Sequence, residues 1–423
     1  MTPRELLTGS FRAALGAADP LVIVPRHLPA PPRGRTLVVG AGKAAASMAL
    51  AVESHWPAAS SLEGVVITRY GHGLALKRIR MVEAGHPVPD EHGEAAAREI
   101  LAAAARLGPD DLLLVLVSGG GSSLLSLPVP GVPMEDLKKM TRDLLASGAP
   151  IQDMNTVRKH LSVIQGGRLA LATRARVLAL VISDVTGDDP THIASGPTVP
   201  DPTTFQDALE ILARFSVVAP PTIAAHLERG AAGTVPETPK PGDPAFARVD
   251  NRVIATAQAS LMSAASYMQQ HGVAPMVLGD SVTGESAEVA KVYAALARQV
   301  RQHGHPVKPP VALISGGETT VTLRKNGRGG RCSEFLLSLA LSLDGLDDTW
   351  ALACDTDGID GSEDNAGAIL SPDALRRARG FGLAPRKMLA ENDSYGFFAA
   401  LGDLVVTGPT RTNVNDYRII MVR

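Results

Sequence analysis

The sequence is short of cysteine, of aromatic residues and of net charge, and each shortage argues against a class of protein. Its only two cysteines, Cys332 and Cys354, lack a CxxC spacing, so neither a disulfide framework nor a structural zinc site is expected. Aromatic residues make up 4% of the chain, and the formal net charge is -2. We therefore expect no stacking platforms for nucleic acid and no electrostatic attraction to DNA, RNA or an anionic membrane.

Long hydrophobic runs are also missing, since no apolar stretch approaches the ~20 residues that a membrane-spanning helix needs. The first residues read as a helix start and not as a signal peptide, with Thr2 as N-cap, Pro3 at the first helical position and Glu5 completing a capping box. We expect a cytoplasmic protein that takes neither nucleic acid nor membrane as a partner. Its oligomeric state stays open, with a homodimer as one option.

What the chain does contain is a regular alternation of short apolar runs and helical patterns. Its 423 residues are too many for one ordinary core, so two domains are expected. Continuous apolar strands joined by helices indicate a parallel sheet covered on both faces. In the first half, the predicted strands are 36–39, 65–68, 112–117 and 177–182, and the predicted helices are 44–53, 94–107, 134–146 and 204–215.

The alternation stops at residues 229–246, where four prolines and three glycines remove any periodicity. This segment is either a domain linker or a long surface loop. Taken as a linker, it divides the chain into domains 1–240 and 241–423. Beyond it, the predicted strands are 252–255, 276–278, 311–314, 350–353 and 418–422, and the predicted helices are 261–270, 286–302 and 333–343.

The first motif is the glycine turn in "TLVVGAGKAAASMA", residues 36–49. Residues 40–45 fit the dinucleotide pattern G-x-G-x-x-A, but the next strand ends in Arg69, without the acid that binds a ribose. A P-loop would need glycine where Leu37 stands and serine or threonine where Ala44 stands. The motif alone leaves three interpretations: an NADP turn, a phosphate turn that presents Lys43, or a tight turn with a solvated lysine.

Two more loops of the first half suggest anion binding. "SGGGSSLL", residues 118–125, places free amides and hydroxyls directly after an apolar strand, which favours an anion-binding loop over a flexible turn. In "NTVRKHLS", Asn155 is expected to cap a helix, so that Arg158 and Lys159 fall on its first turn. Cations at that position oppose the helix dipole, and binding a phosphate or carboxylate would explain them better.

The most acidic loop follows the strand at 177–182. Asp184, Asp188 and Asp189 lie just past its carboxyl end, where open α/β sheets place their ligands. Hard oxygen donors separated by glycine suit Mg²⁺. The alternative is an Asp-rich turn whose side chains cap backbone groups.

The second half carries a matching set of glycine-rich and acidic loops: "GGETTV" at 316–321, "NGRGGRCSE" at 326–334, "CDTDGIDG" at 354–361 and "TGPTRTNVND" at 407–416. Arg328 and Arg331 flank a glycine pair just before a predicted helix, so the arginines and the helix N-terminus are expected to bind phosphate jointly. Such loops at strand ends in both halves predict a two-sided cleft.

Taken in order, these motifs resemble the class II glycerate kinases, the glycerate kinase/MOFRL family. The resemblance runs nearly end to end and is carried by "GAGKAA" at 40, "SGGGSSL" at 118, "NTVRKHLS" at 155, "GGRLA" at 166, "SDVTGDDPTHIASGPTVPD" at 183, "GGETTV" at 316, "GRGGR" at 327, "TDGIDG" at 356 and "TGPTRTNVND" at 407. It implies ATP-dependent phosphorylation of D-glycerate to 2-phosphoglycerate with Mg²⁺. It also implies a larger Rossmann-like domain with a mainly parallel sheet and a smaller α/β MOFRL domain, with the active site in the cleft between them.

The resemblance also implies roles for individual residues. Lys43 is the catalytic lysine and Arg331 its partner, and we expect the two to neutralise the γ-phosphate from opposite sides, because phosphoryl transfer depends on positioning and cations. From the chemistry of phosphoryl transfer and not from the resemblance, we expect Asp188 to accept the proton of the glycerate hydroxyl, and Asp184 and Asp189 to hold Mg²⁺ directly or through water. The expected substrate and phosphate contacts, with ATP and glycerate not assigned to particular loops, are Ser118, Gly119, Gly120, Gly121, Ser122, Asn155, Arg158, Gly316, Gly317, Glu318, Arg328, Thr410 and Asn413.

One departure from the family pattern stands next to the catalytic arginine, where Cys332 and Ser333 replace the usual Asn-Gln pair. Two other functions stay open from the sequence. One is NAD(P)H-dependent hydroxypyruvate reduction, suggested by the G-x-G-x-x-A turn and by an alternative label within the family. The other is an idle protein that binds glycerate or nucleotide without turnover.

Overall fold

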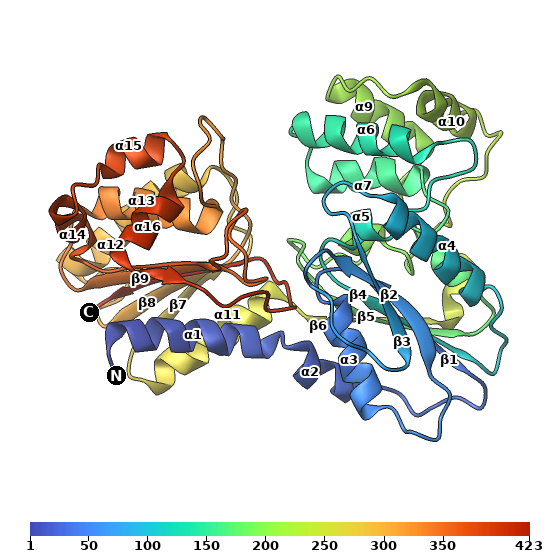
Figure 1. Cartoon of the computed structure of the whole chain (residues 1–423), viewed down its shortest axis with the longest axis horizontal. Helices are drawn as coiled ribbons and strands as arrows, with labels where there is room; N and C mark the ends of the chain where they lie inside the picture. Colours follow the sequence, from blue (N-terminus) through green and yellow to red (C-terminus); the bar gives the residue numbers. More distant parts are fainter. The chain divides into compact units, whose positions relative to one another are not determined.

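A computed structural model describes residues 1–423 and divides the chain into two compact units (Figure 1). One unit is formed by residues 20–254. The other contains residues 255–423 together with residues 1–19. The sequence assigned the first 19 residues to the N-terminal domain. They join the other unit because helix α1 (Pro3–Ala17) buries Leu7, Phe11 and Ala14 in that unit's core.

The unit formed by residues 20–254 is built on a six-stranded sheet in the order β3-β2-β1-β4-β5-β6. Neighbouring strands from β3 to β5 pair in parallel, so their carboxyl ends lie at one edge. The central strands are buried apolar runs, as the sequence indicates. The strands are β1 (Thr36–Ala41), β2 (Glu63–Arg69), β3 (Ile79–Ala84), β4 (Leu112–Val117), β5 (Arg176–Ile182) and β6 (Val249–Ala255).

Helices cover this sheet, and a further group of helices has a core of its own. Helix α4 (Glu91–Ala104) packs on β2 and β3, and α3 (Ala45–His55) also contacts β2. The helical group, at the top of this unit in Figure 1, packs Met140, Val157, Phe205, Ile211 and Leu227 together. Its members are α6 (Met134–Ala146), α7 (Ile151–His160), α9 (Phe205–Arg214) and α10 (Pro221–Ala231).

The other unit contains a mixed sheet in the order β11-β10-β9-β12-β8-β7. The last strand of the chain lies between β9 and β8, antiparallel to both, while β7 and β8 are parallel. The strands are β7 (Ala274–Gly279), β8 (Val311–Ser315), β9 (Thr349–Asp355), β10 (Gly367–Leu370), β11 (Leu404–Val405) and β12 (Asp416–Val422). Alternate residues of β12 enter different cores: Ile419 packs with α1 and α11 (Ala257–Gln270), and Ile420 with α12 (Ser286–His303) and α13 (Arg331–Leu343).

The two-unit α/β architecture confirms the predicted fold class, and the capping box of Thr2 and Glu5 is present at the start of α1. The segment 229–246 lies within the unit formed by residues 20–254 and is not a linker, and it runs from the last residues of α10 into a loop. Thr238 in it is buried, Glu237 accepts from the backbone N–H of Phe205, and the N–H of Asp201 donates to the carbonyl of Pro239. Strand β6 consequently joins the first sheet, although the sequence placed it in the second domain.

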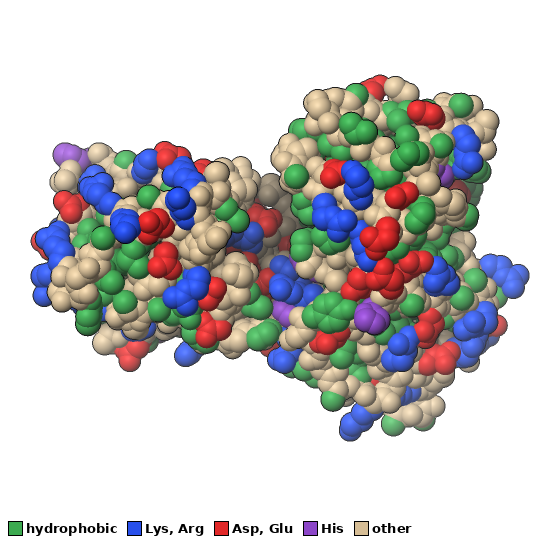
Figure 2. All heavy atoms as spheres, turned by 45° about the horizontal axis from the view of Figure 1, so that its top comes forward, with side chains coloured by type: hydrophobic (Ala, Val, Ile, Leu, Met, Phe, Trp, Pro, Cys, Tyr) green, Lys and Arg blue, Asp and Glu red, His purple; other side chains and the backbone are tan.

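Surface composition agrees with the small net charge. On the face drawn in Figure 2, acidic and basic side chains are interspersed. No single helix combines the length and apolar character of a membrane span, and only the bent pair of α1 and residues 20–27 passes a test of length and composition. The apolar side chains of α1 are already used in the core.

Candidate active site

The carboxyl edge of the parallel sheet brings the glycine turn and the first serine loop together. The backbone N–H of Lys43 donates to the carbonyl of Gly119 at 2.8 Å, and the N–H of Ala44 donates to Ser118 Oγ at 3.0 Å. Lys43 is half-buried in the turn between β1 and α3. Because β1 and β4 are adjacent, these two hydrogen bonds fix the position of the Lys43 backbone at the end of β1.

Gly120 is required at the centre of this loop for two reasons. Its φ of 81° lies in the left-handed region that L side chains rarely adopt. A Cβ at this position would also lie 2.9 Å from the ring of His86 and 3.6 Å from Lys43 Cγ. The backbone of the predicted glycine loop thus comes close to the side chains of His86 and Lys43.

A chain of hydrogen bonds connects the serine loop with helix α7. Ser195 Oγ donates to Ser122 Oγ at 2.9 Å and lies 3.2 Å from Asn155 Oδ1. That amide oxygen also accepts from Arg158 Nη1 at 3.1 Å, while Asn155 Nδ2 donates to the carbonyl of His192 at 2.9 Å. Three predicted motifs therefore meet here, and Ser195, which lies within "SDVTGDDPTHIASGPTVPD" and is not among the predicted site residues, is their junction.

The position of Asn155 and Arg158 in helix α7 corrects the sequence interpretation. The helix begins at Ile151 with Pro150 as N-cap, so Asn155 is an interior residue and Arg158 lies in the last turn. Cations in the last turn interact favourably with the helix dipole, so the dipole argument for an anion at Arg158 is wrong. Burial lowers the pKa of Arg158 to about 10, and its one side-chain hydrogen bond goes to the neutral amide of Asn155.

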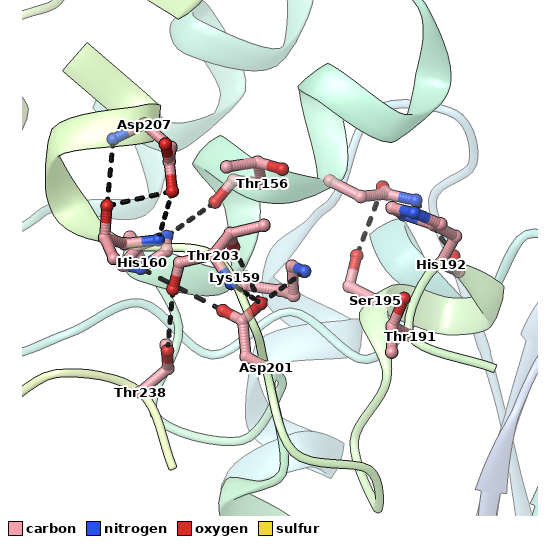
Figure 3. A network of polar contacts seen from close by, with 12 residues as sticks. Thr156, Lys159, His160, Thr191, His192, Ser195, Asp201, Thr203, Asp207 and Thr238 are labelled. Atoms are coloured by element: carbon pink, nitrogen blue, oxygen red, sulfur yellow. Dashed lines mark hydrogen bonds and ion pairs between the residues drawn. The ribbon is translucent and has the colours of Figure 1, made fainter. Parts of the chain in front are cut away.

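The adjacent lysine has a structural role (Figure 3). Lys159 Nζ lies 2.6 Å from Asp201 Oδ1, and both side chains are 0% exposed. Asp201 also accepts from the backbone N–H and the hydroxyl of Thr203. From the sequence, Lys159 is expected to contact a phosphate or carboxylate together with Arg158. The structure contradicts this, because the ammonium group is enclosed and paired.

The acidic loop begins where predicted, immediately after β5. Asp189 is exposed, and its Oδ1 accepts the N–H of Thr191 at 2.8 Å. Partial burial alone would raise the pKa of Asp189, but the hydrogen bonds from Thr191 lower it. Asp188 adopts a φ of 54° and donates its N–H to the carbonyl of Val185.

No group of three or more histidine, cysteine or acidic side chains in the chain is placed to hold a metal ion by itself. Mg²⁺ in kinases does not need one, because it is bound by one or two carboxylates together with substrate phosphates. Asp184, half-buried in this loop, and Asp189 are donors of that kind. Two carboxylates are not a preformed protein cage, so Mg²⁺ held here would take its other ligands from substrate phosphates and water.

In the other unit, the predicted loops converge on Arg331 at one edge of the mixed sheet. Asp416 pairs with Asp355 across β12 and β9. Arg331 Nε donates to Asp416 Oδ1 at 2.7 Å, Nη2 to Asp355 Oδ2 at 2.8 Å and Nη1 to Glu318 Oε1 at 2.5 Å. Burial alone would lower the pKa of Arg331, but these three carboxylates raise it well above its usual value.

Helix α13, which begins at Arg331, offers fewer N–H groups to a ligand than expected. The N–H groups of Cys332 and Ser333 donate to the two carboxylate oxygens of Asp360 at 2.9 and 2.8 Å. The structure therefore contradicts the expectation that these groups of the helix N-terminus bind phosphate. Cys332 and Ser333 are fully buried, so the departure from the family's Asn-Gln pair lies in the core.

The remaining predicted residues of this unit stabilise its loops. The carbonyl of Gly317 accepts the N–H of Asp416, and Thr410 donates its hydroxyl to the carbonyl of Thr356. Asn413 is buried and its Oδ1 accepts the N–H of Asn415. Arg328 is exposed with its guanidinium 4.9 Å from the centre of the Tyr395 ring. Gly316 donates its N–H to the carbonyl of Gly279 and accepts from buried Arg418.

Arg331→Lys tests whether the forked guanidinium organises this edge. A lysine keeps the charge but cannot bridge three carboxylates, so the free energy of unfolding should fall by about 2 kcal/mol. Urea unfolding in a Trp56→Phe background leaves Trp350 in β9 as the only tryptophan to report on this unit. Arg328→Lys is the matched control and should cost under about 0.5 kcal/mol. Equal values for the two variants would contradict the bridging role.

Comparison with known proteins shows which class of protein this chain belongs to. Residues 6–228 match the family described as "Domain of unknown function (DUF4147)", and residues 311–416 match the MOFRL family. The chain is 50% identical over its whole length, and over 95% of the other protein, to an Agrobacterium vitis protein provisionally named a hydroxypyruvate reductase. It is 39% identical to a glycerate 2-kinase of Pyrococcus horikoshii, over 92% of this chain and 88% of that one.

A solved structure agrees with these similarities. The crystal structure of a glycerate kinase from Thermotoga maritima superposes with a TM-score of 0.87 at 36% identity, covering 99% of both chains. Fold and sequence together define a two-domain α/β enzyme of the kinase class. The chain belongs to the class II glycerate kinases, the glycerate kinase/MOFRL family.

Proposed function

We propose that the chain transfers the γ-phosphoryl group of ATP to D-glycerate and forms 2-phosphoglycerate. The observation that supports this most directly is that the carboxyl edge of one parallel sheet holds Lys43 against the backbone of residues 119–120. Hydrogen bonds through Ser122, Ser195 and Asn155 link this loop to Arg158 in α7. Phosphoryl transfer needs cations and donors at fixed positions and little covalent chemistry. The likeness to glycerate 2-kinases over most of the chain supports the same reaction.

In this proposal, Lys43 neutralises charge on the transferred phosphoryl group, and the serine loop donates backbone N–H groups to phosphate oxygens. Asp184 and Asp189 would hold Mg²⁺, which bridges phosphates and neutralises their charge when bound. Asp188 is proposed to accept the proton of the attacking hydroxyl. The pairing of Arg331 with Lys43 on one phosphate concerns residues of different units and stays a prediction.

Reduction of hydroxypyruvate is the second candidate, because the Agrobacterium vitis relative is named for it. The residue geometry gives it less support. β2 ends at Arg69 without the acid that binds a ribose in dinucleotide folds. The G-x-G-x-x-A turn is used instead to fix Lys43 against the serine loop.

Parallel assays separate the two candidates. Purified chain is incubated with D-glycerate, ATP and Mg²⁺, and the product is identified by phosphorus NMR, which distinguishes 2- from 3-phosphoglycerate. A second reaction with hydroxypyruvate follows NADH and NADPH absorbance. We expect 2-phosphoglycerate and no oxidation of either cofactor. Cofactor oxidation without a phosphorylated product would replace the kinase proposal, and 3-phosphoglycerate would correct the position of transfer.

A further inference from the structure

His86 lies at the edge of the parallel sheet where the predicted ligand loops gather. It belongs to the loop between β3 and α4, and β3, β2, β1 and β4 are neighbours that pair in parallel. His86, Lys43 and the serine loop therefore follow the carboxyl ends of strands of one sheet, which is where open α/β sheets bind their ligands. None of the residues proposed above for phosphoryl transfer comes from the loop of His86.

The half-buried imidazole of His86 lies against the glycine at the centre of the serine loop. A Cβ on Gly120 would be 2.9 Å from both Cδ2 and Nε2 of this ring, and 3.6 Å from Cγ of Lys43. The edge of the ring that carries Nε2 thus faces the loop, and the imidazole and the lysine stem are neighbours over the same residue. Because Gly120 has no side chain, there is room for both.

The end of this loop is anchored by Asp90. Its Oδ1 accepts the N–H of Gly93 at 3.0 Å and so caps α4, while its Oδ2 accepts the hydroxyl of Tyr70 at 2.8 Å. The start of the loop is closely packed, since a Cβ on Gly85 would lie 2.6 Å from the carbonyl of Val88. The imidazole is therefore carried by a turn that is tied to a helix, which suits a group that must hold a ligand in a defined position.

The serine loop offers unused hydrogen-bond donors beside this ring. The N–H groups of Gly119 and Gly120 donate to no acceptor in the chain, whereas the N–H of Gly121 donates to the carbonyl of Ser118 at 3.2 Å. Successive main-chain N–H groups that are open to a ligand form an anion-binding concavity. An anion that binds the N–H of Gly120 also lies close to the imidazole, because the ring is in contact with that residue.

Hydrogen-bonding chemistry distinguishes a histidine at this position from a ring that only fills space. A phenylalanine would cover Gly120 equally well, but an imidazole carries Nε2, which bears a proton in the imidazolium and in one neutral tautomer. The ring, the lysine and the two main-chain N–H groups are three kinds of donor around one point. Such a set matches the three terminal oxygens of a γ-phosphate better than the two oxygens of a carboxylate.

We propose that His86 donates a hydrogen bond from Nε2 to an oxygen of the γ-phosphate of the nucleotide, beside Lys43 and the backbone of residues 119–120. His86 is then a ligand-contacting residue of the phosphate site. The inference rests on the proposed function for the identity of the nucleotide. Binding of ATP and ADP can be measured without turnover, so the two can fail separately.

The test compares His86→Phe, which keeps a ring over Gly120 without its nitrogens, with His86→Gln, whose amide provides a donor near the position of Nε2. Steady-state kinetics with D-glycerate are combined with isothermal titration calorimetry of ATP and ADP. His86→Phe should lower kcat about 100-fold and the affinity for ATP about fivefold, with the affinity for ADP within about twofold. His86→Gln should keep kcat within about tenfold of the wild type. His55→Phe, which replaces an exposed histidine at the far end of α3, should change none of these values.

A role of His86 in packing alone would give a different result. Wild-type kcat and ATP affinity in His86→Phe, equal losses in His86→Phe and His86→Gln, or equal losses of ATP and ADP affinity would each overturn the inference. ATP binding that depends on His86 without phosphoglycerate formation would support it and reject the proposed kinase reaction. Phosphoglycerate formation by His86→Phe at the wild-type rate would keep the kinase reaction and reject the inference. A wild-type protein that does not bind ATP would overturn both.

Discussion

Lys43→Met is expected to lower kcat for phosphorylation of D-glycerate by roughly 10³-fold. Methionine keeps an unbranched stem of similar length and removes only the ammonium charge. The hydrogen bond that positions this residue comes from its backbone N–H to Gly119, so the turn should keep its geometry. The loss should therefore fall on transition-state charge stabilisation and not on folding.

The measurement combines steady-state kinetics with equilibrium binding of ATP. Because the proposed contact between Lys43 and the phosphoryl group forms chiefly in the transition state, kcat should fall far more than the affinity for ATP. Lys139→Met is the control, since Lys139 is an exposed lysine paired with Asp143 on helix α6. If kcat of Lys43→Met stays within about tenfold of the wild type, Lys43 is not the catalytic cation.

The strands that shape this edge could be predicted because their chemistry is local. β4 is continuous in buried apolar residues, and its predicted bounds, 112–117, are those observed. β3 was not predicted, because it contains Arg80 and Glu83 and lies half-exposed at the edge of the sheet, so it lacks a continuous apolar run. Helix α6 was also predicted with its observed bounds, and its buried Leu137, Met140 and Leu144 have helical spacing.

The error at helix α7 has a specific physical cause. Asn155 has the side chain of a good N-cap, and Pro150, the observed N-cap, makes no side-chain hydrogen bond. The amide of Asn155 instead bonds His192 and Ser195, which are about forty residues away in the sequence. Local capping rules cannot anticipate a side chain whose partners are supplied by tertiary structure.

The residues of the candidate site also divide into those that local sequence predicts and those whose surroundings only the tertiary structure reveals. Residues held by backbone geometry, such as Lys43 and Gly120, could be found from glycine spacing after a strand. Charges neutralised by distant partners could not, because Arg331 meets Asp355 and Asp416 only when three segments of the chain come together. The sequence consequently marked Arg331 as a cation for phosphate without revealing the carboxylates around it.

The second large effect is expected at the buried ion pair of Lys159 and Asp201. Lys159→Met leaves the Asp201 carboxylate enclosed without its cation, which should lower the free energy of unfolding by about 3–5 kcal/mol. Trp350→Phe makes Trp56 the only tryptophan, and this buried residue reports on the unit formed by residues 20–254. Urea unfolding followed by Trp56 fluorescence measures the change. Lys139→Met, which breaks an exposed pair, should cost under about 1 kcal/mol.

The ion pair of Lys159 and Asp201 should also make the stability of the protein depend on pH. Burial by itself raises the pKa of Asp201, but the charge and hydrogen bond of Lys159 and the bonds from Thr203 lower it below its usual 3.8. A carboxyl with a lowered pKa binds fewer protons in the folded than in the unfolded chain. Its contribution to stability is therefore present above pH 3.8 and is lost as the pH falls through the lowered folded value.

Lys159→Met/Asp201→Asn separates the charge from the packing. Asparagine still accepts from Thr203, so the double variant should recover much of the stability lost in Lys159→Met, because no charge stays buried without a partner. Its stability should also fall less steeply below pH 3.8 than that of the wild type. A double variant as unstable as Lys159→Met would show that the pair acts through packing of the lysine stem.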